Sequence, residues 1–194
     1  MKAILISIKP KYVADILNGK KTIEIRKMMP KCDLPIDVYI YCTKENSLIK
    51  LHDGYGYAHD RYVCGKDYKV DDFPKMYSGY DGQGKVVAKF TLNKVEEIWW
   101  TPSKENPKDL FGKSCLTKEQ IKSYLNGNIG YAWHIDNLEI FDKPKELSEF
   151  KYLKKYSNCD KCIHNKNEYC MLCRECQEIL PLTRASESWR YIEI

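Results

Sequence analysis

The chain has 194 residues, of which 43% are apolar, and 32 basic against 27 acidic residues give it a formal net charge of +5. This length and apolar content exclude a disordered protein and predict one elaborated domain over residues 1–194. No apolar run approaches the roughly 20 residues of a membrane span, so we expect a cytoplasmic protein with no membrane partner. The mild basic excess is compatible with a nucleic-acid partner.

The N-terminal residues predict a strand, a short helix and a second strand. Apolar residues alternate over residues 3–8, and the run ends at Pro10. Residues 11–18 place their apolar side chains on one helical stripe, and Gly19 is the residue type that commonly follows a helix. The helix therefore leads directly into a strand-like run, "GKKTIEIRK", at residues 19–27.

The remaining pattern predicts more strands than helices. Strand-like runs cover residues 37–42, 85–92 with a continuation towards Trp99, 131–141 and 188–194. Residues 43–84 lose this periodicity and predict an insertion of loops and weak strands, and residues 101–114 predict a loop. Thr117 and Gln120 have the spacing of a capping box that opens a helix ending at Asn126. Strands and helices do not alternate regularly, which favours an α+β fold, a closed or nearly closed β-barrel flanked by short helices.

The run at residues 19–27 has one polar face. Alternation places Thr22, Glu24 and Arg26 on that face, and Ile23 and Ile25 on the other. The polar face is either an ordinary solvated strand face with a weak ion pair or one wall of a ligand cleft. Lys21 can join Glu24 and Arg26 only if the strand begins after residue 21.

Five of the nine cysteines fall close together near the C-terminus. Two C-x-x-C pairs can supply four thiolates to one structural zinc ion, and they predict a zinc knuckle over residues 157–178, inserted before the last strand. A third cysteine step and a histidine offer alternative ligands, and iron-sulfur ligation is a further alternative. The predicted zinc ligands are Cys159, Cys162, Cys170 and Cys173, with Cys176 and His164 as the alternatives.

Four residues of the polar run spell G-x-K-x-x-E-x-R: Gly19, Lys21, Glu24 and Arg26. This pattern, directly after a helix near the N-terminus, resembles the signature of the ASCH domain, a relative of the PUA-like barrels. Later stretches resemble the strands of the same family: "GKVVAKFTL", "YAWHIDNLEIFDKP" and "SESWRYIEI". The resemblance implies a PUA-like β-barrel with a cleft beside the first helix, in which the lysine, glutamate and arginine gather, and RNA or a modified nucleotide as ligand.

The resemblance also implies two enzymatic alternatives. Some family members remove the acetyl group of N4-acetylcytidine, and ribonuclease activity has been assigned in the family. The deacetylating members carry a threonine where this chain has Glu24, so the catalytic residues stay unknown, with Lys21, Thr22 and Glu24 as candidates. A third alternative is a protein-interaction module, in which a protein partner contacts the zinc knuckle and the insertion.

Of these functions, ligand binding requires the fewest special properties of these residues. Arg26 offers five donors in one plane, Lys21 adds a compact positive charge, and Glu24 can orient Arg26 or accept from the amine of a base. Trp189 in the last strand can stack on a base or can fill the core. The residues expected to contact nucleic acid are Lys9, Lys21, Glu24, Arg26, Ser188 and Trp189.

Overall fold

The computed structural model describes residues 2–44, 50–52, 58–60, 84–101, 104–155 and 177–194. Strands dominate these ranges, and the helices are short. In chain order the elements are β1 (Lys2–Ile8), α1 (Pro10–Leu17), β2 (Ile23–Arg26), β3 (Ile36–Cys42), β4 (Lys50–His52), β5 (Ala58–Asp60), β6 (Val86–Leu92), β7 (Val95–Ile98), α2 (Leu110–Ser114), α3 (Lys118–Leu125), β8 (Gly130–His134), β9 (Asp136–Lys145), η2 (Leu147–Glu149), β10 (Lys151–Lys155), β11 (Gln177–Pro181) and β12 (Trp189–Glu193).

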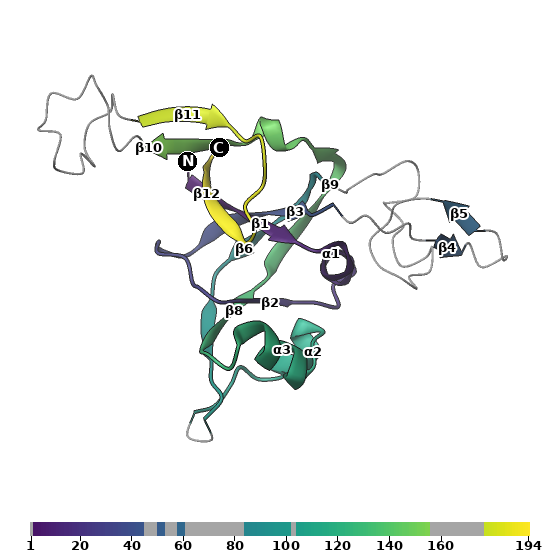
Figure 1. The fold of residues 1–194 in the computed structure, drawn as a ribbon, viewed down its shortest axis with the longest axis vertical. Helices are drawn as coiled ribbons and strands as arrows, with labels where there is room; N and C mark the ends of the chain where they lie inside the picture. The colour runs from purple at the N-terminus through teal and green to yellow at the C-terminus, as the bar shows by residue number, and fades with distance from the viewer. Residues whose placement is uncertain (1, 45–49, 53–57, 61–83, 102–103, 156–176) are drawn as a thin grey trace, which may run out of the picture.

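A seven-stranded sheet forms the larger part of the fold, in the order β11-β10-β12-β1-β3-β6-β9. Its central strand β1 runs parallel to β3 and antiparallel to β12, which brings the two ends of the chain side by side (Figure 1). Residues 3–8 of β1 are all buried because the strand separates two cores. Ile4, Ile6 and Ile8 pack into one core, and Ala3 and Leu5 pack into the other.

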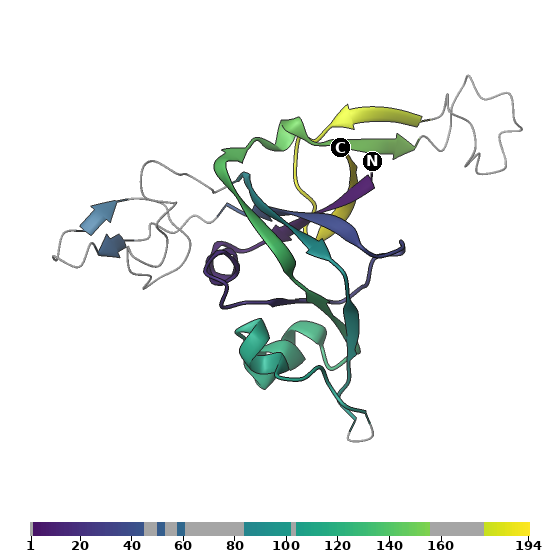
Figure 2. The ribbon, with the colours of Figure 1, turned by 180° about the vertical axis from the view of Figure 1, so that it is seen from behind.

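A separate three-stranded sheet, β2-β8-β7, lies between the larger sheet and helices α2 and α3 (Figures 1 and 2). Ile23 and Ile25 of β2 pack in a third core with Ile121 and Leu125 of α3. Among the described residues the edge strands β11 and β9 of the larger sheet do not pair with each other, and the small sheet pairs only within itself. The expected closed barrel was therefore wrong: the fold is a mostly-sheet α+β structure with two principal sheets.

The helix predictions were confirmed at their ends. The helix after β1 ends at Leu17 with Asn18 as its C-cap, and Gly19 follows with φ +69°, a conformation that glycine adopts without strain. In α3 the Thr117 side chain accepts from the Gln120 backbone, and the Gln120 side chain accepts from the Thr117 backbone. These two bonds form the capping box that the spacing predicted.

Two predicted strands each proved to be two strands in different sheets. The run expected to continue from residue 92 to Trp99 turns at Asn93 and Lys94, so β6 belongs to the large sheet and β7 to the small one. The run at residues 131–141 divides at Ile135 in the same way, into β8 and β9. Hydrophobic periodicity does not indicate such a change of sheet, because it reports which residues are apolar and not which strands they pair with.

Four elements were not predicted: α2 lies in the expected loop of residues 101–114, η2 follows β9, and β10 and β11 flank the cysteine-rich region. Of the expected insertion at residues 43–84, the short strands β4 and β5 pair antiparallel. Residues 45–49, 53–57 and 61–83 of that insertion lie outside the described residues. So do residues 156–176, which include all five clustered cysteines and His164. The zinc knuckle therefore stays a prediction; the described residues contain no metal-ligand cluster. None of the described helices is long and apolar enough to cross a membrane.

Candidate functional site

The turn between α1 and β2 sets the position of Lys21. The backbone amides of Lys20 and Lys21 both donate to the carbonyl oxygen of Asp15, each at 2.9 Å. These bonds close the chain back onto the end of α1, so β2 begins only at Ile23. Because residue 21 precedes the strand, strict alternation does not apply to it, and its side chain lies with those of Glu24 and Arg26.

Glu24 bridges two cations inside the protein. Its carboxylate oxygens lie 3.2 Å from Nζ of Lys21 and 3.0 Å from a guanidinium nitrogen of Arg26. All three residues are buried, with exposed fractions of 1%, 7% and 6% for Lys21, Glu24 and Arg26. The polar face of β2 is thus not an ordinary solvated face. We call these three residues the buried triad.

Three other segments hold the triad in place. Nζ of Lys21 donates to the carbonyl oxygen of Ser114, at the end of α2, at 2.7 Å. Arg26 donates to the carbonyl oxygen of Ser7 in β1 at 2.8 Å and to Oγ of Ser188, just before β12, at 3.3 Å. The triad therefore joins the small sheet to the large sheet and to the helical layer.

A pocket of about 280 Å³ opens beside the triad. Its walls come from α1 and the residue before it, from β2, from α3, and from the segment that leads into β12. The lining residues are Ser7, Ile8, Lys9, Tyr12, Lys21, Glu24, Ile25, Arg26, Leu116, Gln120, Tyr124, Glu187 and Ser188.

Two tyrosines on opposite elements give the pocket flat, neutral walls. Burial raises the pKa of Tyr12, and the charges of Glu24 and Asp15 raise it further. Burial also raises the pKa of Tyr124, and the opposing effect of Arg26 does not cancel this rise. Both phenols therefore stay protonated at neutral pH, so they can donate a hydrogen bond but cannot act as bases.

The site has an unused donor and a surplus of positive charge. Nε of Arg26 is buried and has no hydrogen-bond partner among the described residues. Buried polar atoms without partners are rare in folded proteins. Two cations around one carboxylate leave a formal charge of +1, so the pocket favours an anionic or electron-rich polar guest.

The residues predicted from the sequence separate into two groups. Lys9 and Ser188 line the pocket with the triad. Trp189 does not line it and packs instead against the fully buried Trp133, with ring centroids 5.5 Å apart. Thr22 is exposed and is not among the lining residues, and its backbone pairs with Lys113 and Ile135.

Several lining residues were missed by the sequence reasoning. Tyr12 falls in the apolar stripe of the first helix and Tyr124 in that of α3, so periodicity alone predicts a packing role for both. Gln120 and Tyr124 are four residues apart and so share one face of α3. This i, i+4 pair of polar and aromatic residues was the available signal. Nothing in the local sequence of Ser7 or Glu187 indicates a pocket.

A second cluster, of two basic side chains around a carboxylate, lies on the same small sheet. Glu96 of β7 lies 3.0 Å from Nζ of Lys94 and 2.5 Å from Nε2 of His134 in β8. Burial of Glu96 raises the pKa of its carboxyl, but hydrogen bonds from Lys94 and His134 lower it by more. We call these three residues the surface triad.

No protein-family model and no curated protein matches the chain. Among solved structures, the ASCH protein from Zymomonas mobilis is similar, with 16% identity, a TM-score of 0.46, and coverage of 75% of this chain and 73% of that one. A tyrosine-to-phenylalanine mutant of that protein gives 18% identity, a TM-score of 0.46, and coverage of 76% and 77%. These structures carry the ASCH name that the motif at residues 19–26 suggested, and the likeness is one of fold alone.

Proposed function

We propose that the pocket beside the buried triad binds a nucleotide of RNA, either standard or modified. The observation that carries the proposal is a buried group of two cations and one carboxylate in the wall of a pocket that also presents two protonated tyrosines. The ASCH resemblance of the motif supports the same class of ligand.

Stability alone is a poor reason for such a group. Burying an ion costs several kcal/mol after relaxation, and replacing a buried ion pair with well-packed apolar side chains is often neutral or stabilising. Ile23 and Ile25 already anchor β2 in the third core. The triad therefore adds little that apolar residues could not supply, whereas a polar guest needs its charges.

The donors and acceptors in the pocket match the groups of a nucleotide. The planar guanidinium of Arg26 suits a phosphate or the edge of a guanine, and Glu24 can accept from the exocyclic amine of a base. The rings of Tyr12 and Tyr124 offer faces on which a base can stack. At about 280 Å³ the pocket is near the lower end of small-molecule sites, which suits one nucleoside.

Replacement of Arg26 by lysine tests this proposal. The lysine keeps the charge but loses the planar set of donors, so we expect affinity for a fluorescein-labelled random RNA hexamer to fall at least tenfold. Fluorescence anisotropy measures the affinity, and a far-UV circular dichroism spectrum checks folding. Arg190→Lys is the matched control, because Arg190 stacks on Tyr152 and does not line the pocket. Equal binding by Arg26→Lys and the parent would show that RNA does not bind in this pocket.

The enzymatic alternatives receive less support from the geometry. Thr22, the candidate nucleophile, lies outside the pocket lining, and Nζ of Lys21 already contacts Ser114 and Glu24. The binding proposal predicts that N4-acetylcytidine incubated with the protein releases no acetate above the blank, and that the RNA hexamer stays intact. Acetate release that the Glu24→Gln variant abolishes would establish the hydrolase instead.

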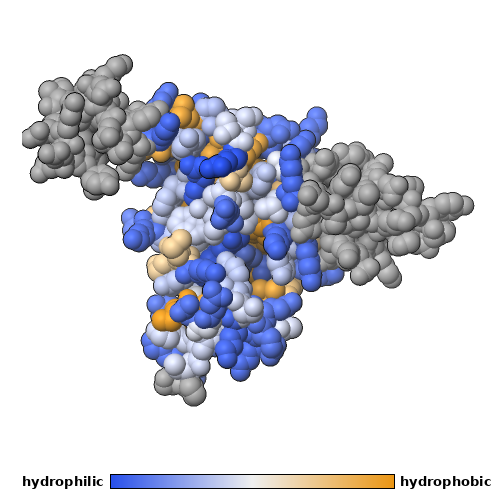
Figure 3. Space-filling model, in the orientation of Figure 1, coloured by the Kyte–Doolittle hydropathy of each residue, from blue (hydrophilic) through white to orange (hydrophobic). Residues whose placement is uncertain are grey.

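The surface around the site is polar. In Figure 3 the described part of this face is mostly hydrophilic, and the apolar residues occur in separate spots. A polar, charged ligand fits such a face better than the apolar core of a protein interface. Binding through a protein partner would instead appear as a complex insensitive to salt, whereas RNA binding weakens as salt rises.

We also propose one structural zinc ion, held by Cys159, Cys162, Cys170 and Cys173, with Cys176 as an alternative ligand. This proposal rests on the sequence, since two C-x-x-C pairs supply the four thiolates of a closed tetrahedral site. We expect elemental analysis of the purified protein to find about one zinc per chain, and Cys159→Ser to lower the content at least fivefold. Purified protein that contains no zinc, or contains iron and sulfide, would contradict it.

A further inference from the structure

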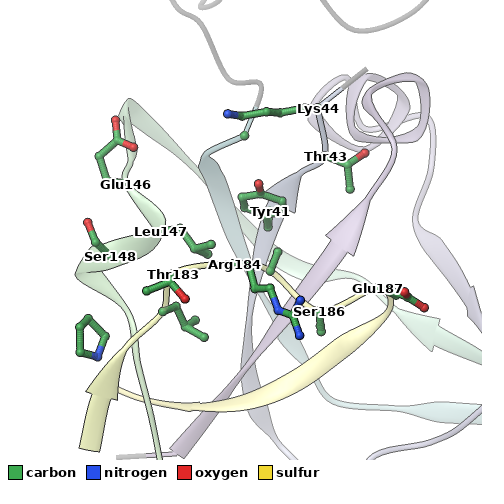
Figure 4. A pocket seen from close by; sticks show the side chains of 14 residues that line it. Tyr41, Thr43, Lys44, Glu146, Leu147, Ser148, Thr183, Arg184, Ser186 and Glu187 are labelled. Carbon is green, nitrogen blue, oxygen red and sulfur yellow. The ribbon is translucent and has the colours of Figure 1, made fainter. Parts of the chain in front are cut away.

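A second and larger pocket, of about 790 Å³, lies on the other side of the segment that leads into β12. Figure 4 shows its walls: the end of β3 and the residues after it, the η2 region, and residues 181–187. The pocket is separate from the buried triad, but Glu187 lines both pockets.

Two cations in this second pocket are available to a ligand. Lys44 and Arg184 are exposed, and neither forms an ion pair with a described residue. In Figure 4 the Arg184 side chain extends towards Ser186 and Glu187, which is the side of the pocket nearest the first one. The pocket also holds two carboxylates. Glu146 is already paired with Lys85 at 3.0 Å, and Glu187 lies at the boundary between the pockets.

The segment that separates the pockets is short and tied to the triad. The carbonyl oxygen of Ser186 accepts a hydrogen bond from Oγ of Ser7 at 2.6 Å. The carbonyl oxygen of Ser188 accepts a hydrogen bond from the backbone amide of Ser7. Oγ of Ser186 is buried without a partner among the described residues. The α-carbons of Arg184 and Ser188 are four residues apart, so they are separated by at most about 14 Å.

We propose that the ligand is a single strand of RNA rather than a free nucleotide: one nucleotide lies in the triad pocket, and the strand continues over Glu187 into the second pocket, where Lys44 and Arg184 contact its phosphates. This inference rests on the proposed function and extends it by a second site. A separation of at most about 14 Å corresponds to no more than about four nucleotide steps at the spacing of stacked bases, roughly 3.4 Å, so a hexamer is long enough to reach both pockets. Phosphate contacts of this kind position a strand without reading its sequence.

The proposal predicts that affinity depends on the length of the RNA. The parent protein should bind a random RNA hexamer at least tenfold more tightly than a random RNA dinucleotide, because only the hexamer reaches both pockets. The double variant Lys44→Ala with Arg184→Ala should lose most of this advantage and bind the dinucleotide as the parent does. Anisotropy competition against a labelled hexamer gives all four affinities.

The salt dependence supplies a second readout. Each phosphate contact to a single strand contributes about 0.7 to the slope of log affinity against log salt, so the double variant should lower the magnitude of the slope by about 1.4 for the hexamer. The control is Lys31→Ala with Lys143→Ala, which removes two exposed cations that line neither pocket. This control should bind both RNAs within twofold of the parent.

Each alternative outcome has a separate meaning. If the hexamer and the dinucleotide bind equally, or if the double variant and the control weaken hexamer binding equally, the second site is overturned. The proposed function survives that result as long as Arg26→Lys still weakens binding. If the parent binds neither RNA, the proposed function and this inference fail together.

Discussion

The buried triad and the surface triad have similar side chains but differ in their exposure to solvent. Each is a glutamate between two basic side chains on the sheet β2-β8-β7. The exposed fractions of the side chains in the buried triad are 1% for Lys21, 10% for Glu24 and 7% for Arg26. In the surface triad they are 60% for Lys94, 31% for Glu96 and 20% for His134.

Burial, and not the number of ion pairs, gives the two clusters different roles. In water-exposed pairs the attraction is screened and each pair contributes at most about 1 kcal/mol. In the buried triad every charge depends on its partners, because water cannot replace them. The buried triad also lies in the wall of a pocket with Tyr12 and Tyr124, and all three of its members line that pocket. The comparison predicts large effects of substitution at Glu24 and small ones at Glu96.

The largest difference is expected in stability. Glu24→Gln leaves Lys21 and Arg26 as two buried cations without a counter-charge, so we expect it to lower the free energy of unfolding by about 3–5 kcal/mol. Glu96→Gln should lower it by less than about 1 kcal/mol. Urea-induced unfolding of both variants at neutral pH measures the difference. Equal effects at the two positions would show that burial does not separate the clusters.

The next difference is expected in binding. Lys21→Gln keeps a donor for the carbonyl of Ser114 and lowers the formal charge of the triad from +1 to zero, so affinity for the RNA hexamer should fall about tenfold. Lys94→Gln removes the same charge from the surface triad and should change affinity less than twofold. Anisotropy titrations at one fixed salt concentration compare them. A larger loss of affinity with Lys94→Gln would indicate that RNA binds at the surface triad instead.

The smallest difference is expected in the acid range. Because the pKa of Glu96 in the folded protein is lowered, its ionised form stabilises the fold above the ordinary glutamate value of about 4.3, and this contribution is lost as the pH falls through the lower folded value. The parent should therefore be more stable than Glu96→Gln at pH 5 by less than about 1 kcal/mol. This gap should shrink towards pH 3, where urea unfolding of both proteins would give equal values. A stability difference that grows as the pH falls would contradict a lowered pKa of Glu96 in the folded protein.

The sequence predicted the helix and the strand that form the site, but not the burial of the charged side chains in it. The helix, Gly19 and the strand after it followed from periodicity and turn chemistry, which are local properties. The burial of Glu24 and Arg26 did not, because the groups that cover them come from Ser7, Ser188 and α3, far away in the chain. The same pattern of residues would also describe a solvated strand.

The pairing of the strands likewise could not be predicted from local sequence patterns. Strand β12 was predicted from its alternation, but its place beside β1 depends on long-range pairing. The expected single strands at residues 85–99 and 131–141 each change sheet midway, at Asn93 and Ile135. Hydrophobic periodicity does not show which strand each segment pairs with, so the two separate sheets could not be distinguished from a closed barrel.

The most direct test of the central claim observes Arg26 itself. The Nε–H resonance of Arg26, assigned by its loss in Arg26→Lys, can be followed in ¹H–¹⁵N spectra while a random RNA dinucleotide is added. Because this buried donor has no partner among the described residues, we predict that its resonance shifts in a saturable way, while that of Arg190 stays in place. An Arg26 resonance that does not move when the protein is saturated with RNA would contradict the account.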